Sequence, residues 1–98
     1  MTRDVLIEKS SNRKWLALPE PARGRLKIEL NDVAATKEPS KHPKVKLLEG
    51  PRESVYRLRV GDYRVVFTVE LSQVLVWRVG RRKRIYDGID NMYAKVTA

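Results

Sequence analysis

The chain has 98 residues, which suits one domain with a single hydrophobic core. Lysine and arginine number 21 against 12 acidic residues, and the net charge of +9 favours an anionic partner such as nucleic acid, an acidic protein or a membrane surface. Cysteine is absent, which excludes disulfides and thiolate zinc sites, and no run approaches the ~20 apolar residues of a membrane span. We therefore expect a single cytoplasmic domain over residues 1–98, without a signal peptide or a membrane partner.

The first predicted element is a short strand in which Val5 and Ile7 share one face. A short helix follows, with its N-cap at Ser10 or Ser11. Pro19 ends this helix because proline cannot continue the hydrogen-bond ladder.

A second helix is predicted to begin at Glu20 and Pro21, since an acidic residue and a proline both suit a first helical turn. Its apolar residues recur at helical spacing. They are Ala22, Leu26, Leu30, Val33 and Ala34. The link between the two helices is short, so we expect them to pack as an antiparallel helical hairpin.

Residues 36–54 are rich in polar residues and proline, and this composition predicts an ordered loop with an apolar anchor at Leu47 and Leu48. The only histidine, His42, lies in this segment. A single histidine without clustered partners is typical of a solvated loop residue rather than a metal ligand. No metal and no cofactor are therefore expected.

Three strands are predicted at about residues 55–60, 63–69 and 73–79, with Gly80 ending the third. Gly61 and Asp62 join the first two as a two-residue hairpin turn, in which glycine supplies a positive φ. This turn places Arg59 directly opposite Arg64, and like charges in that position destabilise a hairpin. A fold tolerates such a pair more readily where the site holds something negative. Residues 85–98 are predicted to be a short helix or a partly ordered tail.

The order strand, helix, helix, strand, strand, strand predicts an α+β fold, in which a helical hairpin packs on one face of an antiparallel sheet. The face under the helices is predicted to carry Tyr56, Leu58, Val60, Tyr63, Val65, Phe67, Leu75, Trp77 and Val79. The opposite face is predicted to carry Arg57, Arg59, Arg64, Arg78, Val66, Val74 and Val76. It would form a basic, partly apolar surface that is open to a ligand.

The basic residues of this face, with the cations after the third strand and a nearby tyrosine, favour the chemistry of a metal-free ribonuclease. Fixed guanidinium groups can stabilise the pentacoordinate phosphate that forms when a 2′-hydroxyl attacks. Cations around Tyr86 favour its phenolate, so this side chain can act as a base or orient the nucleophile. The predicted phosphate-binding residues are Arg57, Arg59, Arg64, Arg81, Arg82 and Lys83, and the predicted catalytic residues are Arg59, Arg64, Arg82 and Tyr86.

Two stretches of the chain closely resemble the RelE toxin family of toxin–antitoxin pairs. They are residues 56–67, which read Tyr-Arg-Leu-Arg-Val-Gly-Asp-Tyr-Arg-Val-Val-Phe, and residues 80–86, which read Gly-Arg-Arg-Lys-Arg-Ile-Tyr. The Leu-Glu-Gly at 48–50 also looks like the family's motif ahead of the hairpin. The resemblance extends over about residues 3–87, although the N-terminal half is similar in pattern only.

The resemblance implies a RelE-like fold and an mRNA endonuclease that works in the ribosomal A site without metal, leaving a 2′,3′-cyclic phosphate. It also implies two kinds of partner. One is a cognate acidic antitoxin, RelB-like, which would wrap the toxin in a hetero-oligomer. The other is a 70S-type ribosome with its mRNA.

By the same resemblance, Arg57 and Arg59 fall where the family often has basic residues that bind phosphate and serve the proton transfers. Arg64 and Arg82 match phosphate-contacting arginines, with Arg82 assisting the leaving group. Tyr86 matches the tyrosine that stacks on the base or helps to activate the 2′-hydroxyl. Some members have lysine at 57 and 59, and many have histidine at 81. Arginine is a poor proton shuttle, so the identity of the general base stays open.

Two other functions remain open from the sequence. A ParE-like toxin that poisons gyrase would share the fold without needing the arginine and tyrosine cluster. A catalytically weak nucleic-acid-binding or antitoxin-binding module would keep the phosphate contacts and lack proton-transfer groups. The predicted convergence of Arg64, Arg82 and Tyr86 favours the ribonuclease.

Overall fold

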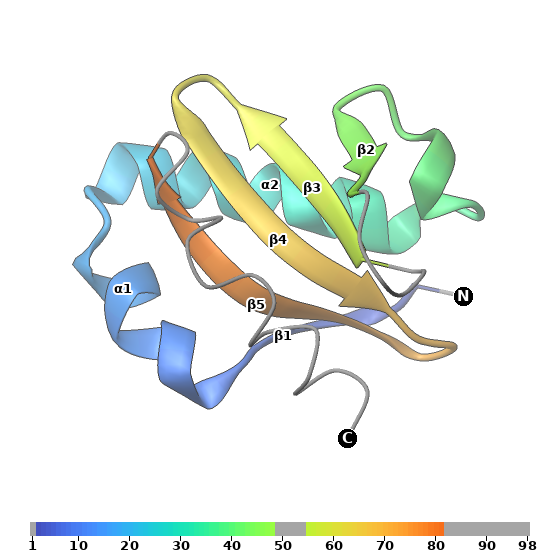
Figure 1. The fold of residues 1–98 in the computed structure, drawn as a ribbon, viewed down its shortest axis with the longest axis horizontal. Helices are drawn as coiled ribbons and strands as arrows, with labels where there is room; N and C mark the ends of the chain where they lie inside the picture. The colour runs from blue at the N-terminus through green and yellow to red at the C-terminus, as the bar shows by residue number, and fades with distance from the viewer. Residues whose placement is uncertain (1, 49–54, 82–98) are drawn as a thin grey trace.

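A computed structural model describes residues 2–48 and 55–81, and its fold is α+β, as predicted (Figure 1). The helices are α1 (Asn12–Ala17) and α2 (Glu20–Ala35), and two 3-10 turns lie at Lys9–Ser11 and Pro39–Lys41. The strands are β1 (Asp4–Ile7), β2 (Val45–Leu47), β3 (Val55–Val60), β4 (Tyr63–Val69) and β5 (Gln73–Arg81).

The five described strands form one sheet in the order β1-β5-β4-β3-β2. Strands β2 to β5 pair antiparallel with their neighbours, whereas β1 pairs parallel with β5. The predicted antiparallel sheet is confirmed in all pairings but one, and β1 adds a parallel pairing at the edge. The first strand of the chain lies beside the last described one, so the sheet joins segments far apart in the sequence.

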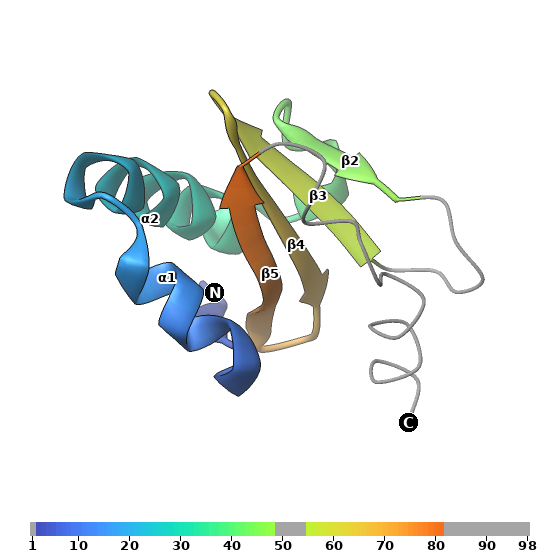
Figure 2. The same ribbon diagram turned by 60° about the vertical axis from the view of Figure 1, so that its left-hand side comes forward.

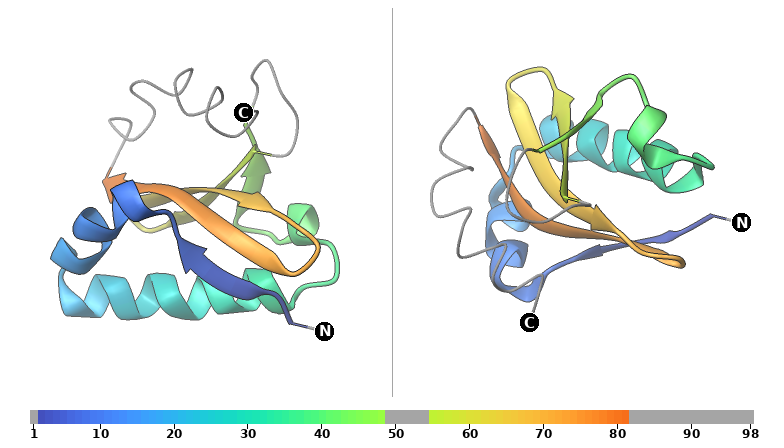
Figure 3. Two further views of the ribbon diagram at one scale, coloured as in Figure 1. Left: turned by 90° about the horizontal axis from the view of Figure 1, so that it is seen from below. Right: turned by 45° about the vertical axis from the view of Figure 1, so that its right-hand side comes forward.

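Helix α2 covers one face of the sheet along its length (Figures 2 and 3). Its buried residues are the predicted ones, namely Ala22, Leu26, Leu30, Val33 and Ala34. The core cluster joins residues of this helix to Leu58, Val65 and Phe67 of the central strands. On these strands, residues that alternate with the core residues point away from α2 and form the second face of the sheet.

Helix α1 begins where the sequence predicts, but its cap differs from the prediction. Ser11 occupies the N-cap position without a side-chain capping bond, and its hydroxyl donates instead to the backbone carbonyl of Trp77. Trp15 and Leu18 are partly buried against the core cluster, whereas Leu16 is 61% exposed. The serine therefore ties α1 to β5, and the helix adds little buried surface of its own.

The β3–β4 hairpin is formed as predicted. Gly61 has a φ of 59°, which lies in the left-handed region that glycine enters at little cost. Val60 faces Tyr63 and Arg59 faces Arg64 across the two strands. The like-charge pair expected from the sequence is therefore present beside the turn.

Strand β5 departs from the predicted alternation. Its register against β4 shifts between Val66 and Phe67, and Trp77 is left without a direct partner. A bulge of this kind moves every residue on one side of it to the other face of the sheet. Val74 and Val76 are therefore buried in the core, while Leu75 and Trp77 are not, which reverses the prediction for these four residues. Gly80 pairs with Arg64 and does not end the strand, which runs on to Arg81.

Strand β2 is the element that the sequence analysis missed. Residues 45–47 pair with β3, in the segment that was predicted to be a loop. Leu47 is 52% exposed and does not anchor the segment, so the predicted apolar anchor is wrong for Leu47, whereas Leu48 is half-buried. The alternation in Lys44-Val45-Lys46-Leu47 is the available signal, but four residues are too few to distinguish a strand from a loop. Among the described residues, no helix combines the length and apolar character needed to cross a bilayer.

Candidate nucleic-acid interface

The structure gathers four predicted arginines on the side of the sheet that faces away from α2. Arg57 and Arg78 both pair with Val66, which lies between core residues on β4, and Arg59 pairs with Arg64. Directly paired residues of antiparallel strands share a face, so all four point to the same side. We call this surface the arginine face and define it by Arg57, Arg59, Arg64 and Arg78.

The arginine face also carries apolar residues. Val55 and Val66 lie on it and are buried, and Thr68 pairs with Val55. The indole nitrogen of Trp77 donates to the Thr68 hydroxyl over 2.9 Å, which holds the tryptophan on this side. The face is therefore basic, with half-buried Trp77 as an apolar contributor. Of the three valines predicted here, Val66 lies on this face but is fully buried, and Val74 and Val76 lie in the core.

Two backbone hydrogen bonds anchor Arg64 on the face. One of its terminal guanidinium nitrogens donates to the carbonyl of Gly61 over 2.9 Å and to that of Tyr63 over 3.1 Å. These bonds turn the guanidinium toward the hairpin turn and fix it relative to Arg59. A fixed guanidinium with donors to spare suits a phosphate better than a mobile one, because less entropy is lost on binding.

Arg81 does not join this group. It pairs with Tyr63, whose ring packs against the core on the helix side, and its guanidinium carbon lies 5.7 Å from the centre of that ring. One of its nitrogens also lies 3.6 Å from the Asp62 carboxylate. The prediction that Arg81 lies on the same face as Arg64 is therefore wrong. The residue that pairs with Arg64 is Gly80, and Arg81, the next residue of β5, points to the opposite face.

The remaining predicted site residues, Arg82, Lys83 and Tyr86, lie outside the described residues. Their roles in binding and catalysis stay predictions. The same holds for the Leu-Glu-Gly resemblance, of which only Leu48 falls within the described part of the chain.

Strand β2 adds cations that the sequence analysis did not connect with the site. Lys46 pairs directly with Arg57, and the backbone of Lys44 accepts a hydrogen bond from the backbone N–H of Arg59. A hollow of about 480 Å³ opens between β2 and β3. It is lined by Pro43, Lys44, Val45, Lys46, Arg57, Arg59 and Gly61, and we call it the β2–β3 groove.

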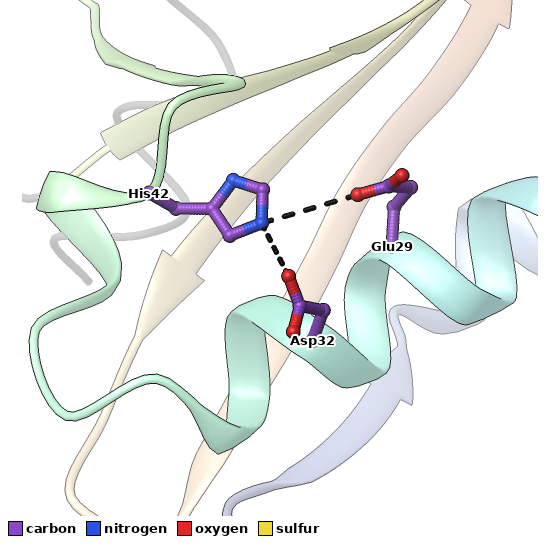
Figure 4. A group of neighbouring side chains, drawn as sticks. All are labelled: Glu29, Asp32 and His42. Atoms are coloured by element: carbon purple, nitrogen blue, oxygen red, sulfur yellow. Dashed lines mark hydrogen bonds and ion pairs between the residues drawn. The ribbon is translucent and has the colours of Figure 1, made fainter.

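His42 is buried beside two acidic residues of α2 (Figure 4). Its Nε2 lies 2.7 Å from an Asp32 carboxylate oxygen and 3.9 Å from one of Glu29. The interpretation of His42 as a solvated loop residue without clustered partners is therefore wrong. The carboxylates belong to a helix ten or more residues earlier in the chain, so the cluster is invisible until the chain folds.

The hydrogen bonds of His42 identify the cluster as a brace. Its Nδ1 accepts from the backbone N–H of Lys44 over 3.1 Å, so the proton of the neutral ring is on Nε2, which donates to Asp32. The same side of α2 binds the Lys44 ammonium, whose nitrogen lies 2.6 Å from Glu29. The three ligand atoms lie within 4.8 Å of one another, and in this tautomer a metal would have to displace the Nε2 proton before binding there. The brace joins the start of β2 to α2.

Comparison with known proteins places the chain in a family. The model of the family described as the ParE toxin of the type II toxin–antitoxin system parDE matches residues 7–86. The chain belongs to this toxin family. No curated protein matches the toxin.

Solved structures similar to the toxin come from the same superfamily of RelE and ParE toxins. One is the archaeal RelE–RelB complex from Pyrococcus horikoshii OT3, with 31% identity over 86% of the toxin and 99% of that chain, and a TM-score of 0.65. Another is the RelB–RelE antitoxin–toxin complex from Methanococcus jannaschii, with 26% identity over 85% and 96%, and a TM-score of 0.67.

The isolated Escherichia coli RelE toxin is similar in fold, with a TM-score of 0.66 at 22% identity, covering 93% of the toxin and 98% of that chain. The RelE-like fold predicted from the sequence is thereby confirmed.

Proposed function

We propose that the toxin is a ribosome-dependent, metal-independent mRNA endoribonuclease that cleaves in the A site. The observation that carries the proposal is the arginine face, in which Arg59 and Arg64 oppose each other on a surface that α2 does not cover. A like-charge pair costs stability unless an anion bridges it. The likeness to RelE structures supports an RNA phosphate as that anion.

The chemistry assigned to this site is an internal transfer at phosphorus. The 2′-oxygen attacks the adjacent phosphorus and loses its proton, while the bond to the 5′-oxygen breaks and that oxygen gains a proton. Arg64 and Arg59 stabilise the added negative charge on the phosphoryl oxygens. We assign Arg82 to the leaving oxygen and Tyr86 to the attacking hydroxyl. Arg57 is placed to bind a neighbouring phosphate, and the products are a 2′,3′-cyclic phosphate and a 5′-hydroxyl.

We also propose that an acidic, RelB-like antitoxin holds the toxin inactive in a hetero-oligomer. The similar structures from Pyrococcus horikoshii and Methanococcus jannaschii are complexes of RelE with RelB, which supports this partner. The net charge of +9 favours an acidic protein, because opposite charges speed association and favour the correct partner.

Gyrase poisoning is the second candidate, and one observation favours it. The matching family model is described as ParE rather than RelE. A toxin of that kind acts on a protein target and leaves mRNA intact. The two candidates therefore predict different damaged molecules in the same cells.

Induced expression, followed by mapping of mRNA 5′ ends against ribosome position, distinguishes the candidates. We expect new ends to cluster within A-site codons, in step with growth arrest. Intact mRNA together with broken DNA would contradict the proposal and favour gyrase.

The catalytic assignment is tested with Arg82→Ala and Tyr86→Ala. Each is expected to abolish growth arrest while antitoxin binding and the unfolding midpoint stay unchanged, since loss of one transition-state donor costs roughly a hundred- to thousand-fold in rate. Arg13→Ala, at an exposed position on α1, removes the same charge elsewhere and serves as the control. Undiminished toxicity in both site variants would overturn the assignment.

A further inference from the structure

The β2–β3 groove carries more positive charge than the described structure balances. Two like-charge pairs follow each other across the sheet, Lys46 with Arg57 and then Arg59 with Arg64. No described residue forms an ion pair with the side chain of Lys46, Arg57 or Arg59. Lys44, in contrast, is bound by Glu29. Three cations that pair with no described acidic residue therefore meet along one hollow, and two of them, Arg57 and Arg59, belong to the arginine face.

We propose that the β2–β3 groove is a second phosphate subsite, in which Lys46 and Arg57 bind the backbone of the same single-stranded RNA that reaches Arg59 and Arg64. This inference rests on the proposed function, because it extends the substrate beyond the scissile phosphate. Successive cation pairs are two residues apart on β3, which separates them by roughly 7 Å. An extended strand of RNA presents its phosphates in such a row, and basic grooves bind it by following that row.

The composition of the groove favours RNA over an acidic protein. Among the described residues, its lining contains four cations and no acidic, aromatic or large aliphatic side chain. Protein interfaces depend on buried aromatic and aliphatic anchors surrounded by a polar rim. A polyanion needs no such anchor, since release of counterions supplies most of its binding free energy. Lysine and arginine in an open hollow match that requirement.

The brace described above fixes one wall of the groove. His42 accepts from the backbone N–H of Lys44, and its carbonyl accepts from the backbone N–H of Val45. Lys44 in turn accepts from Arg59 on the neighbouring strand. The backbone of β2, including that of Lys46, is therefore held in place without a ligand, which lowers the backbone entropy lost on binding.

Binding of a short oligouridylate tests the inference. Its sugars carry 2′-O-methyl groups, so that no attacking hydroxyl is present and only binding is measured. The affinity of the wild-type toxin, Lys46→Ala and Lys14→Ala is measured by fluorescence anisotropy over a range of salt concentrations. Lys14 is exposed on α1, outside the groove, so its variant loses the same charge without the contact.

Lys46→Ala is expected to weaken binding roughly fivefold near 0.1 M salt and to lower the slope of log affinity against log salt by about 0.7, the share of one phosphate contact on a single strand. Lys14→Ala is expected to match the wild type. Equal slopes for Lys46→Ala and Lys14→Ala would overturn the inference. Polyglutamate of matched charge is the competing probe, and if it bound in a Lys46-dependent way while RNA did not, the groove would belong to an acidic protein.

Cleavage on programmed ribosomes separates this inference from the proposed function. Lys46→Ala is expected to raise KM with kcat unchanged, because the contact is equal in the ground state and the transition state. Cleavage by the wild type without any effect of Lys46→Ala on KM or on RNA binding would remove the subsite and leave the proposed function intact. Absence of cleavage by the wild type would remove the proposed function, while the anisotropy result still decides whether RNA occupies the groove.

Discussion

The Arg59–Arg64 pair is the residue-scale feature in which stability and function oppose each other. Both guanidinium groups lie beside the hairpin turn, and Arg64 is held there by two backbone carbonyls. Repulsion between them persists in the free toxin, and under the proposed function a phosphate between them would relieve it. Removal of one partner should therefore stabilise the fold and harm the activity.

We expect Arg59→Ala to raise the free energy of unfolding by roughly 0.2–1 kcal/mol, the range for a cross-strand pair. The same variant should cleave mRNA at least tenfold more slowly, since it loses a phosphate contact. Denaturant unfolding and ribosome-dependent cleavage measure the two effects. A variant that is both less stable and fully active would contradict the role given to the pair, and Arg13→Ala controls for the change in net charge.

His42 is the residue-scale determinant of the position of β2. Its ring is buried and uses both nitrogens, one toward α2 and one toward the backbone of Lys44. His42→Ala leaves that backbone N–H without a partner, and we expect a loss of about 1–3 kcal/mol in the free energy of unfolding. Lys41→Ala removes an exposed ion pair with Glu38 and should cost well under 1 kcal/mol.

The tautomer of His42 adds a second measurement. A metal at Nε2 would have to displace the proton shared with Asp32, so we expect zinc not to raise the unfolding temperature of the toxin at concentrations near that of the protein. A rise that is lost in His42→Ala would show that the cluster binds metal and not merely braces β2. Nickel and manganese serve as comparison ions, since an adventitious surface effect would not follow the affinity order of nitrogen ligands.

At the scale of elements, replacing glycine by alanine is expected to change the stability of the toxin in opposite directions at two positions. Gly61 has a φ of 59° and Gly24 lies inside α2, and a Cβ at either position would meet no atom within 4 Å. Gly61→Ala should destabilise the toxin by about 1 kcal/mol, because an L-residue strains the left-handed conformation. Gly24→Ala should stabilise it by about 1 kcal/mol through helix propensity. Thermal unfolding of both variants checks the pair, and equal effects would contradict the assignment of the turn.

The sequence predicts the central elements well because their patterns are long and regular. The stripe of α2, the β3–β4 hairpin and the arginine pair at Arg59 and Arg64 all follow from spacing and from one glycine. Strand β2 was missed because its three residues, one of them a half-exposed leucine, resemble a loop. Its stability comes from pairing with β3 rather than from its own pattern.

The face of a side chain near a bulge is harder to predict than the strand that carries it. The irregularity at Trp77 moves Val74 and Val76 into the core, and no feature of the β5 sequence marks the extra residue. Arg81 is a second example. The sequence analysis placed it with Arg64, whereas its pairing with Tyr63 places it on the opposite face of the sheet. Cations on one strand share a face when they are an even number of residues apart, and this rule no longer holds across a bulge.

At the scale of the whole molecule, the net charge of +9 sets how the toxin responds to salt. We expect its affinity for ribosomes to fall steeply as salt rises, because each phosphate contact releases condensed counterions. Four contacts from the arginine face and the groove would give a slope near 3 in log affinity against log salt, at about 0.7 each. Sedimentation with ribosomes over a salt series measures it. A flat response would indicate a protein target such as gyrase.

The parallel pairing of β1 with β5 sets the order in which a newly made toxin can become complete. Residues 4–7 leave the ribosome early and find their partner only when residues 73–76 have followed. Contacts of such wide separation form slowly, because a long loop must close before the pairing gains anything. The nascent chain therefore carries an unfinished sheet for most of its synthesis, and the outer border of β5 stays uncovered until β1 docks.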